Sequence, residues 1–187
     1  MRARDAPTGW GWVTRTLHWT MAALILFQLG FGLWMTRVPD LLQRFVLTQT
    51  HKSLGTLIFA LALLRLGWRL ANRRPPLPPA MPAWQRRAAR LSHAALYVLM
   101  LLLPLSGWLM ASASPTQDLL GMQNLVFGRW PLPDPFVPGD APLEAAAHAV
   151  HAGAATALAA LLALHAAAAL RHQFVDRDGL LARMIRG

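Results

Sequence analysis

The chain has 187 residues, of which 55% are hydrophobic, and its formal net charge at neutral pH is +10. It contains no cysteine, which excludes disulfides, thiolate metal sites and iron–sulfur clusters. So positive a charge would suit nucleic acid, but the basic residues lie just outside long apolar blocks rather than across one soluble face. We therefore expect a protein embedded in membrane lipid that binds no nucleic acid.

Four apolar blocks predict membrane-spanning helices. A helix rises about 1.5 Å per residue, so about 20 apolar residues cross the hydrocarbon core of a bilayer. The first block begins near Leu17, is too long for the core of a signal peptide, and is followed by no small-residue cleavage site. We expect spans at about residues 16–36, 48–70, 88–111 and 143–170. The sequence thus predicts an all-α fold, with residues 1–187 forming one membrane domain built as a four-helix bundle.

The segments between the spans differ in charge, and this predicts their orientation. Arginines gather in both tails and around the Pro/Arg-rich link at residues 71–87. The other links, including the long loop at residues 112–142, carry few basic residues and several acidic ones. Basic segments stay in the cytoplasm, so we expect both termini and the link 71–87 there, with the loop 112–142 outside. An even number of spans agrees with this arrangement.

Histidines fall at two depths within the predicted spans. Ionisable residues inside a membrane are costly to bury and usually functional. Towards the cytoplasmic ends lie His18, His93 and His165, towards the external ends lie His51, His148 and His151, and His172 lies just beyond the fourth span. The two depths suggest two separate sites, one near each face of the membrane.

The spacing on the fourth span suggests two haems. His151 and His165 are separated by 165 − 151 = 14 residues, close to four helical turns, so they share a face and lie roughly 21 Å apart. Two haems stacked across a bilayer need axial ligands at about this separation, and neutral imidazole is the commonest such ligand. His51 matches His151 in depth, and His18 matches His165. We therefore predict two non-covalent b-type haems, because four imidazoles in lipid would be costly without a metal.

The other histidines leave alternatives open. His93 shares the depth of His18 and could replace it as a ligand, contact a haem propionate, contact a quinone, or simply pack. His148 lies one turn from His151 and could be the ligand in its place. His172 lies among polar residues and is the weakest of the candidates.

Charged residues and glycines beside these histidines have less specific predicted roles. Arg15 and Arg69 could pair with haem propionates on the cytoplasmic side, and Lys52 could do so externally or attract an anionic substrate. The alternative for all three is a snorkelling or topology-setting charge. Close approach of a porphyrin or of a neighbouring helix would explain the glycines Gly30, Gly32, Gly55 and Gly107. No pattern identifies catalytic residues.

Five segments, in this order along the chain, resemble motifs of the bacterial cytochrome b561 family. They are Arg15–Trp19, Thr50–Gly55, Arg65–Arg69, Ser92–Trp108 and Leu164–His172. The resemblance implies a multi-pass, di-haem b protein of the bacterial inner membrane, with His18, His51, His151 and His165 as axial ligands. The additional His148 departs from the family pattern.

The resemblance also implies electron exchange with quinone. Some members of this family oxidise superoxide outside the membrane, whereas others are electron-transfer subunits of hydrogenases and other redox partners. We therefore expect a quinone-linked oxidoreductase, with superoxide at the external side as a candidate substrate and an electron-transfer subunit as the alternative. A haem-free transporter is the remaining hypothesis.

Overall fold

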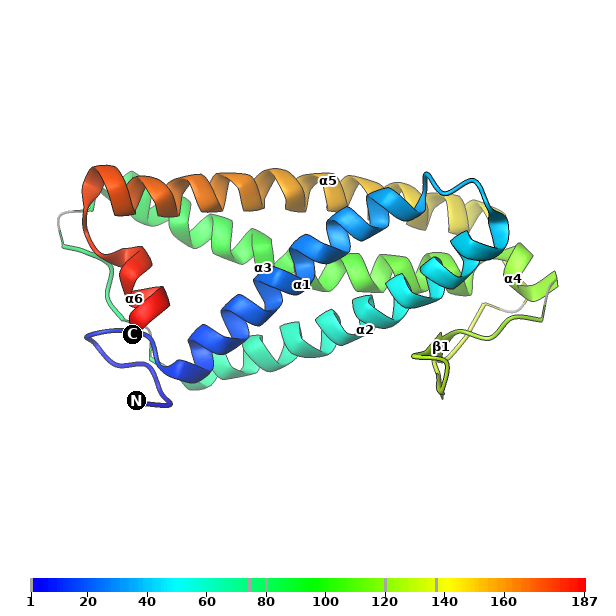
Figure 1. Cartoon of the computed structure of the whole chain (residues 1–187), viewed down its shortest axis with the longest axis horizontal. Helices are drawn as coiled ribbons and strands as arrows, with labels where there is room; N and C mark the ends of the chain where they lie inside the picture. Colours follow the sequence, from blue (N-terminus) through cyan, green and yellow to red (C-terminus); the bar gives the residue numbers. More distant parts are fainter. Residues whose placement is uncertain (1, 74, 80, 120, 137) are drawn as a thin grey trace.

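Four long helices make up the body of the protein. The computed structural model describes every residue except 1, 74, 80, 120 and 137. The long helices are α1 (Trp12–Met35), α2 (Leu41–Ala71), α3 (Ala83–Ser112) and α5 (Ala141–Arg171). Each is long and apolar enough to cross a membrane, which confirms the predicted all-α fold with four spans. Both chain termini lie at one end of the bundle, which we call the tail end (Figure 1).

The opposite end, which we call the loop end, carries the segment from residue 113 to residue 140 (Figure 1). Short elements complete the described chain: α4 (Pro115–Leu119), β1 (Leu125–Val126), β2 (Trp130–Pro131), the π-helical turn η1 (His172–Asp176) and α6 (Leu180–Arg186). Strands β1 and β2 form a two-stranded antiparallel hairpin.

The helices extend beyond the spans predicted from hydropathy. Helix α2 begins at Leu41 and α3 at Ala83, each several residues before the predicted apolar stretch. Asp40 explains the start of α2, because its carboxylate accepts a hydrogen bond from the Gln43 amide at 2.6 Å. Hydropathy detects the part of a helix that lies in hydrocarbon, whereas capping decides where the helix itself begins.

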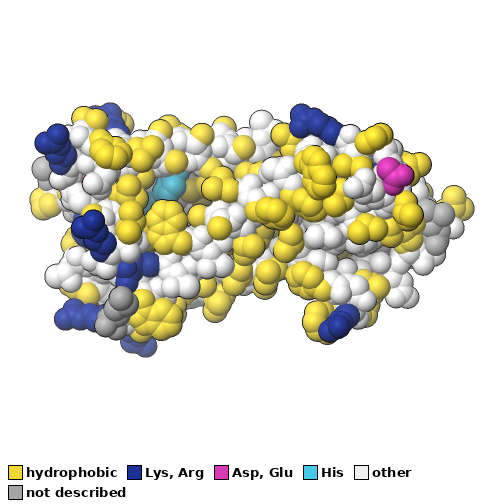
Figure 2. Space-filling model, in the orientation of Figure 1, with side chains coloured by type: hydrophobic (Ala, Val, Ile, Leu, Met, Phe, Trp, Pro, Cys, Tyr) yellow, Lys and Arg dark blue, Asp and Glu magenta, His cyan; other side chains and the backbone are white. Residues whose placement is uncertain are grey.

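The surface of the bundle suits lipid rather than water. In the most apolar stretch of each long helix, only 11% to 17% of residues are buried inside the protein. Leu26, Phe27, Leu64 and Leu164 are all more than half exposed. Figure 2 shows a middle zone without charged side chains, while basic side chains gather at the tail end. An apolar surface of this extent is expected of helices that contact a bilayer.

A small apolar core occupies the middle of the bundle. All four long helices contribute to it: Met21, Ile25, Ile58, Ala62, Leu96, Met100 and Leu158. Leu158 lies midway between His151 and His165 on α5, seven residues from each (158 − 151 = 7 and 165 − 158 = 7). The core therefore forms an apolar layer between the two histidine levels.

The helices do not pack equally on one another. Helix α3 packs along α5, α1 packs on α2, and α2 packs on α3. Among the described residues, α5 approaches α3 far more closely than it approaches α1 or α2. The histidines of α5 meet those of α1 and α2 across this wider separation.

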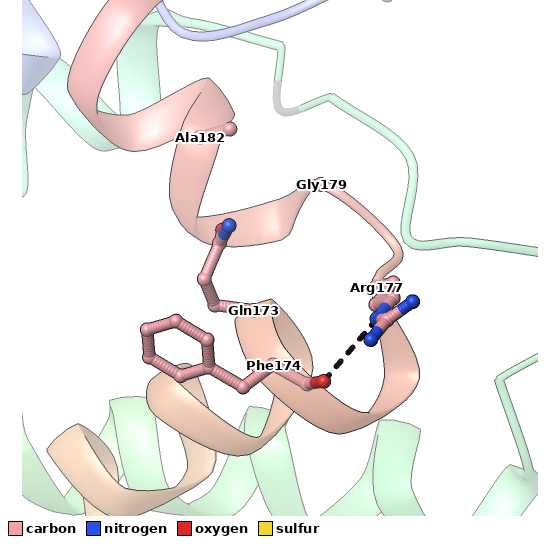
Figure 3. A pocket seen from close by; sticks show the side chains of 5 residues that line it. All are labelled: Gln173, Phe174, Arg177, Gly179 and Ala182. Atoms are coloured by element: carbon pink, nitrogen blue, oxygen red, sulfur yellow. Dashed lines mark hydrogen bonds between the residues drawn. The ribbon is translucent and has the colours of Figure 1, made fainter.

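The C-terminal segment folds back over the tail end. The Trp19 indole N–H donates to the Met184 carbonyl at 3.1 Å, and the Arg15 guanidinium donates to the Ile185 carbonyl at 2.8 Å. Between η1 and α6 is a shallow surface hollow of about 370 Å³, lined by Gln173, Phe174, Arg177, Gly179 and Ala182 (Figure 3). Arg177 Nε donates to the Phe174 carbonyl at its edge. Contacts between α6 and α1 thus join the two ends of the chain.

The charge distribution predicts that the tail end lies in the cytoplasm. A fluorescent protein fused after Gly187 should therefore fluoresce, and alkaline phosphatase fused at the same point should be inactive, since the phosphatase folds only outside the cytoplasm. Phosphatase fused after Gly139, in the loop-end segment, should be active. An active C-terminal phosphatase fusion would show that the orientation is reversed.

Candidate functional site

Two histidines from different helices meet towards the loop end. His51 on α2 and His151 on α5 have ring centres 6.2 Å apart, with ring planes at 72°. The ring of Phe31 on α1 lies nearly parallel to that of His51, also at 6.2 Å between centres. The side-chain amide of Gln28 donates to the His51 carbonyl at 2.6 Å, which ties α1 to α2 at this level. We call His51 and His151 the loop-end pair.

The surroundings of His151 orient its ring for metal binding. Its Nδ1 lies 3.0 Å from the Leu103 carbonyl and 3.2 Å from the Ser106 hydroxyl. A carbonyl can only accept, so Nδ1 donates its proton to Leu103 and Nε2 keeps a free lone pair. Metal-binding histidines are typically held by such a bond from the second ring nitrogen. His51 Nδ1 is buried and has no hydrogen-bond partner among the described residues.

Two glycines make room for these rings. A Cβ atom added at Gly32 would lie 2.9 Å from Cε1 of His51, and one at Gly107 would lie 3.1 Å from Cε1 of His151. Both distances are shorter than an ordinary van der Waals contact. By contrast, a Cβ at Gly30 would meet nothing within 4 Å, and one at Gly55 would make only an ordinary contact with Gln28. Gly32 and Gly107 thus allow the loop-end pair to lie against α1 and α3.

Three histidines gather towards the tail end. His18 on α1 and His165 on α5 have ring centres 6.3 Å apart, with planes at 63°. His93 belongs to α3, which packs against α5, and its ring centre is 5.5 Å from that of His165. The side chain of His93 is exposed, whereas those of His18 and His165 are partly buried. We call these residues the tail-end group.

A cation that the sequence analysis did not assign belongs to this group. Arg65 Nη2 lies 2.8 Å from His18 Nδ1. Its guanidinium carbon is 5.8 Å from the centre of the Tyr97 ring, and that of Arg69 is 4.7 Å from the same ring. The signal was present in the sequence, because Arg65 and Arg69 are separated by one helical turn within a span.

The other charged candidates bond elsewhere. Arg15 reaches the C-terminal segment rather than a histidine. Lys52 Nζ donates to Asn124 Oδ1 at 2.8 Å and to Gln117 Oε1 at 3.4 Å. Asn124 and Gln117 in turn donate to Asp134. This network joins Lys52 to the loop-end segment instead of directing it at the loop-end pair.

The two remaining histidines lie apart from these groups. His148 is exposed on α5. His172 Nδ1 lies 2.7 Å from an Asp178 carboxylate oxygen and 3.2 Å from one of Asp176. These contacts stabilise the π-helical turn after α5, beyond the tail-end group.

The spacing of the histidine rings fits iron with two axial imidazoles. A metal–imidazole bond is about 2 Å and each nitrogen is about 1.1 Å from its ring centre, so two imidazoles across one iron have centres about 6.3 Å apart. His51 and His151 are at 6.2 Å, and His18 and His165 are at 6.3 Å. At 5.5 Å, the spacing of His93 and His165 is shorter than this arrangement requires. The spacing of these two pairs is therefore the spacing that two bis-imidazole haems would need between α5 and its neighbours α1 and α2.

Comparisons with known proteins agree with this chemistry. The family model described as prokaryotic cytochrome b561 matches residues 9–187. Cytochrome b561 homolog 2 of Escherichia coli K12 is 30% identical over 196 residues, covering 99% of this chain and 95% of the relative. Homolog 1 of the same organism is 33% identical over 141 residues, covering 75% of each chain. Cytochrome b562 of Cereibacter sphaeroides is 31% identical over 176 residues, covering 91% of each.

Proposed function

Because this chain belongs to the prokaryotic cytochrome b561 family, whose members are membrane b-type cytochromes that transfer electrons, we propose that it carries electrons between two haems and exchanges them with quinone. The observation that carries the proposal is the pair of imidazole contacts at 6.2 and 6.3 Å, both made by the single helix α5. The membrane proposed is the bacterial inner membrane, with the tail end in the cytoplasm.

The proposed ligands are His51 and His151 for the loop-end haem, and His18 and His165 for the tail-end haem. A haem held by two imidazoles supplies one-electron transfer and has no open position for oxygen. The Leu103 carbonyl and Ser106 hydroxyl hold the His151 ring, and His148 is exposed one turn away, which favours His151 as the ligand.

The chain's own residues separate the two levels. The apolar core around Met21, Ile58 and Leu158 fills the layer between the histidine levels and excludes water from it. Leu158 lies about two helical turns from either histidine of α5, so the levels are roughly 21 Å apart along that helix. In such a layer electrons pass between levels while protons and ions are excluded, because charged groups are poorly solvated there.

Arg69, together with Arg65, is proposed to balance the carboxylates of the tail-end haem. Both arginines lie beside Tyr97, at the depth of His18. Arg15 contacts the C-terminal segment, so its proposed role is to hold α6 over this end. A propionate role for Lys52 would require its amine to leave Asn124.

The proposed quinone site is beside the tail-end haem, near His93. The His93 side chain is exposed at the bundle surface and its ring approaches that of His165. A lipid-soluble quinone could approach an exposed side chain at this depth from within the bilayer, and an imidazole can hydrogen-bond a quinone oxygen.

Haem content tests the four proposed ligands directly. The purified protein should show the reduced-minus-oxidised spectrum of a b-type cytochrome and about two haems per chain by pyridine haemochrome assay, since each bis-imidazole level holds one. His51→Ala or His165→Ala should each reduce the content to about one.

Exposed His148→Ala is the matched control for the ligand variants and should keep both haems. A colourless protein from cells well supplied with haem would refute the proposal. A protein that holds two haems but exchanges electrons with quinone only when a redox partner protein is added would instead support the alternative of an electron-transfer subunit.

Gly32→Ala should disturb the loop-end haem. The added methyl group would lie 2.9 Å from Cε1 of His51 and displace that ring, so that haem should bind more weakly, with a content falling from about two towards one per chain. Gly30→Ala adds the same methyl group where nothing lies within 4 Å and should leave the content unchanged. Equal haem content and spectra in the two variants would count against this arrangement.

His93→Ala should slow quinone reduction at least tenfold, the cost of losing roughly 1.4 kcal/mol of hydrogen bonding to quinone. Haem content and spectrum should stay unchanged, because His93 is not a proposed ligand. Stopped-flow oxidation of the reduced protein by a soluble quinone would measure the rate. An unchanged rate with both haems present would remove His93 from the quinone site, and a lost haem would make it a ligand.

A further inference from the structure

The two histidine levels differ in the charge around them. In the tail-end group, Arg65 lies against His18, and Arg69 lies one turn further along α2 beside Tyr97. Both are permanently charged, because guanidinium is not deprotonated in proteins. These are cations inside a helix that spans the membrane, where an unbalanced charge is expensive. Two arginines at this depth are therefore expected to have a negatively charged partner or a functional role.

The tail-end carboxylates that the structure describes are engaged elsewhere. Asp5 accepts hydrogen bonds from the Gly11 amide and the Thr14 hydroxyl. Asp176 and Asp178 contact His172, and Asp176 also lies 3.6 Å from Arg171. None of these hydrogen bonds and ion pairs involves Arg65 or Arg69. The carboxylates of Asp5, Asp176 and Asp178 thus do not neutralise the guanidinium groups of Arg65 and Arg69.

The loop-end pair has uncharged neighbours. Phe31, the Leu103 carbonyl and the Ser106 hydroxyl contact its rings. The nearest cation in sequence is Lys52, whose amine bonds Asn124 and Gln117 and interacts electrostatically with Asp134. The Asp134 carboxylate, which also accepts from Ser112, offsets that amine. Among the described residues, a cation contacts a histidine ring of these two levels only at the tail end, although Arg37 and Arg44 also lie at the loop end.

The contact between Arg65 and His18 also has a consequence for haem binding. When Nε2 of a neutral imidazole binds iron, Nδ1 carries the ring proton and becomes a donor. Arg65 Nη2 is itself a donor, so these two atoms cannot stay at 2.8 Å in the haem-loaded protein. Either Arg65 or the His18 ring must therefore shift when haem binds. Because the Arg65 guanidinium also lies 5.8 Å from the centre of the Tyr97 ring, a small shift leaves its charge at the tail-end level.

We propose that Arg65 raises the reduction potential of the tail-end haem above that of the loop-end haem, so that electrons shared between them reside mainly at the tail end. Reduction adds one negative charge, which a nearby cation in a medium of low dielectric constant stabilises. The inference rests on the proposed function and concerns an equilibrium. One iron is reduced as the other is oxidised, and nothing else is consumed.

The test is a potentiometric titration of the purified protein, resolved into two one-electron components. Arg65→Gln should lower the component of higher potential and leave the other nearly in place, so that the separation between them shrinks. Arg65→Lys keeps the charge and should retain most of the separation. Arg90→Gln, which removes an exposed cation from α3 on the same side, is the matched control and should move neither component appreciably.

Single-haem variants assign the components to levels. In His51→Ala, which should keep only the tail-end haem, adding Arg65→Gln should lower the one remaining potential. In His165→Ala, which should keep only the loop-end haem, the same substitution should have no comparable effect. If Arg65→Gln does not accumulate, Arg69→Gln provides the second variant. It should lower the same component by less, because Arg69 lies over the Tyr97 ring, whereas Arg65 contacts His18 directly.

Haem content is measured first, because it distinguishes a failure of the proposed function from a failure of the inference about Arg65. Fewer than two haems in the unsubstituted protein would contradict the proposed function itself. With two haems bound, the inference about Arg65 is overturned by any of three results: a higher potential at the loop end, equal shifts of both components in Arg65→Gln, or a shift in Arg65→Lys as large as in Arg65→Gln.

Discussion

The structure depends on the cost of placing imidazoles inside a lipid bilayer. An uncompensated polar ring in hydrocarbon is unfavourable, and this chain puts several at two levels of one bundle. Bonds to iron would compensate for the burial of these imidazoles. The same bonds would cross-link α5 to α1 and α2. These are the helices whose backbones approach α5 less closely than α3 does. In the proposed holoprotein the haems therefore stabilise the bundle as well as transfer electrons.

Close packing on one side of α5 complements the wider separation on the other. Helix α3 packs against α5, and it supplies both the Leu103 carbonyl that orients His151 and the Gly107 that admits its ring. On α1, Gly32 does the same for His51. Residues without a functional side chain thus determine where the functional rings lie. Small residues are common where the backbones of membrane helices approach closely, and here they also leave room for imidazole rings.

Charge distinguishes the two ends of the protein. Arginines at the tail end are the basis for the predicted orientation of the spans, and two of them extend that charge along α2 to His18 and Tyr97. At the loop end, the network from Lys52 through Asn124 to Asp134 binds the loop segment to α2. A bundle with similar histidine levels at its two ends therefore has different electrostatic surroundings at each.

The sequence by itself determined the four spans and the depth of each histidine. Both are one-dimensional properties, because apolar length and the rise per residue fix position along a helix axis. The match in depth of His18 with His165 and of His51 with His151 followed from this alone. Only the tertiary structure decided the lateral neighbours, which depend on how each helix is rotated and how closely it packs. It exposed His148 while placing His151 against Ser106, tied Lys52 to Asn124, and brought Arg65 to His18. When lipid-facing and bundle-facing residues are both apolar, hydropathy carries no information about how a helix is rotated about its own axis. For that reason these contacts could not be predicted from the sequence.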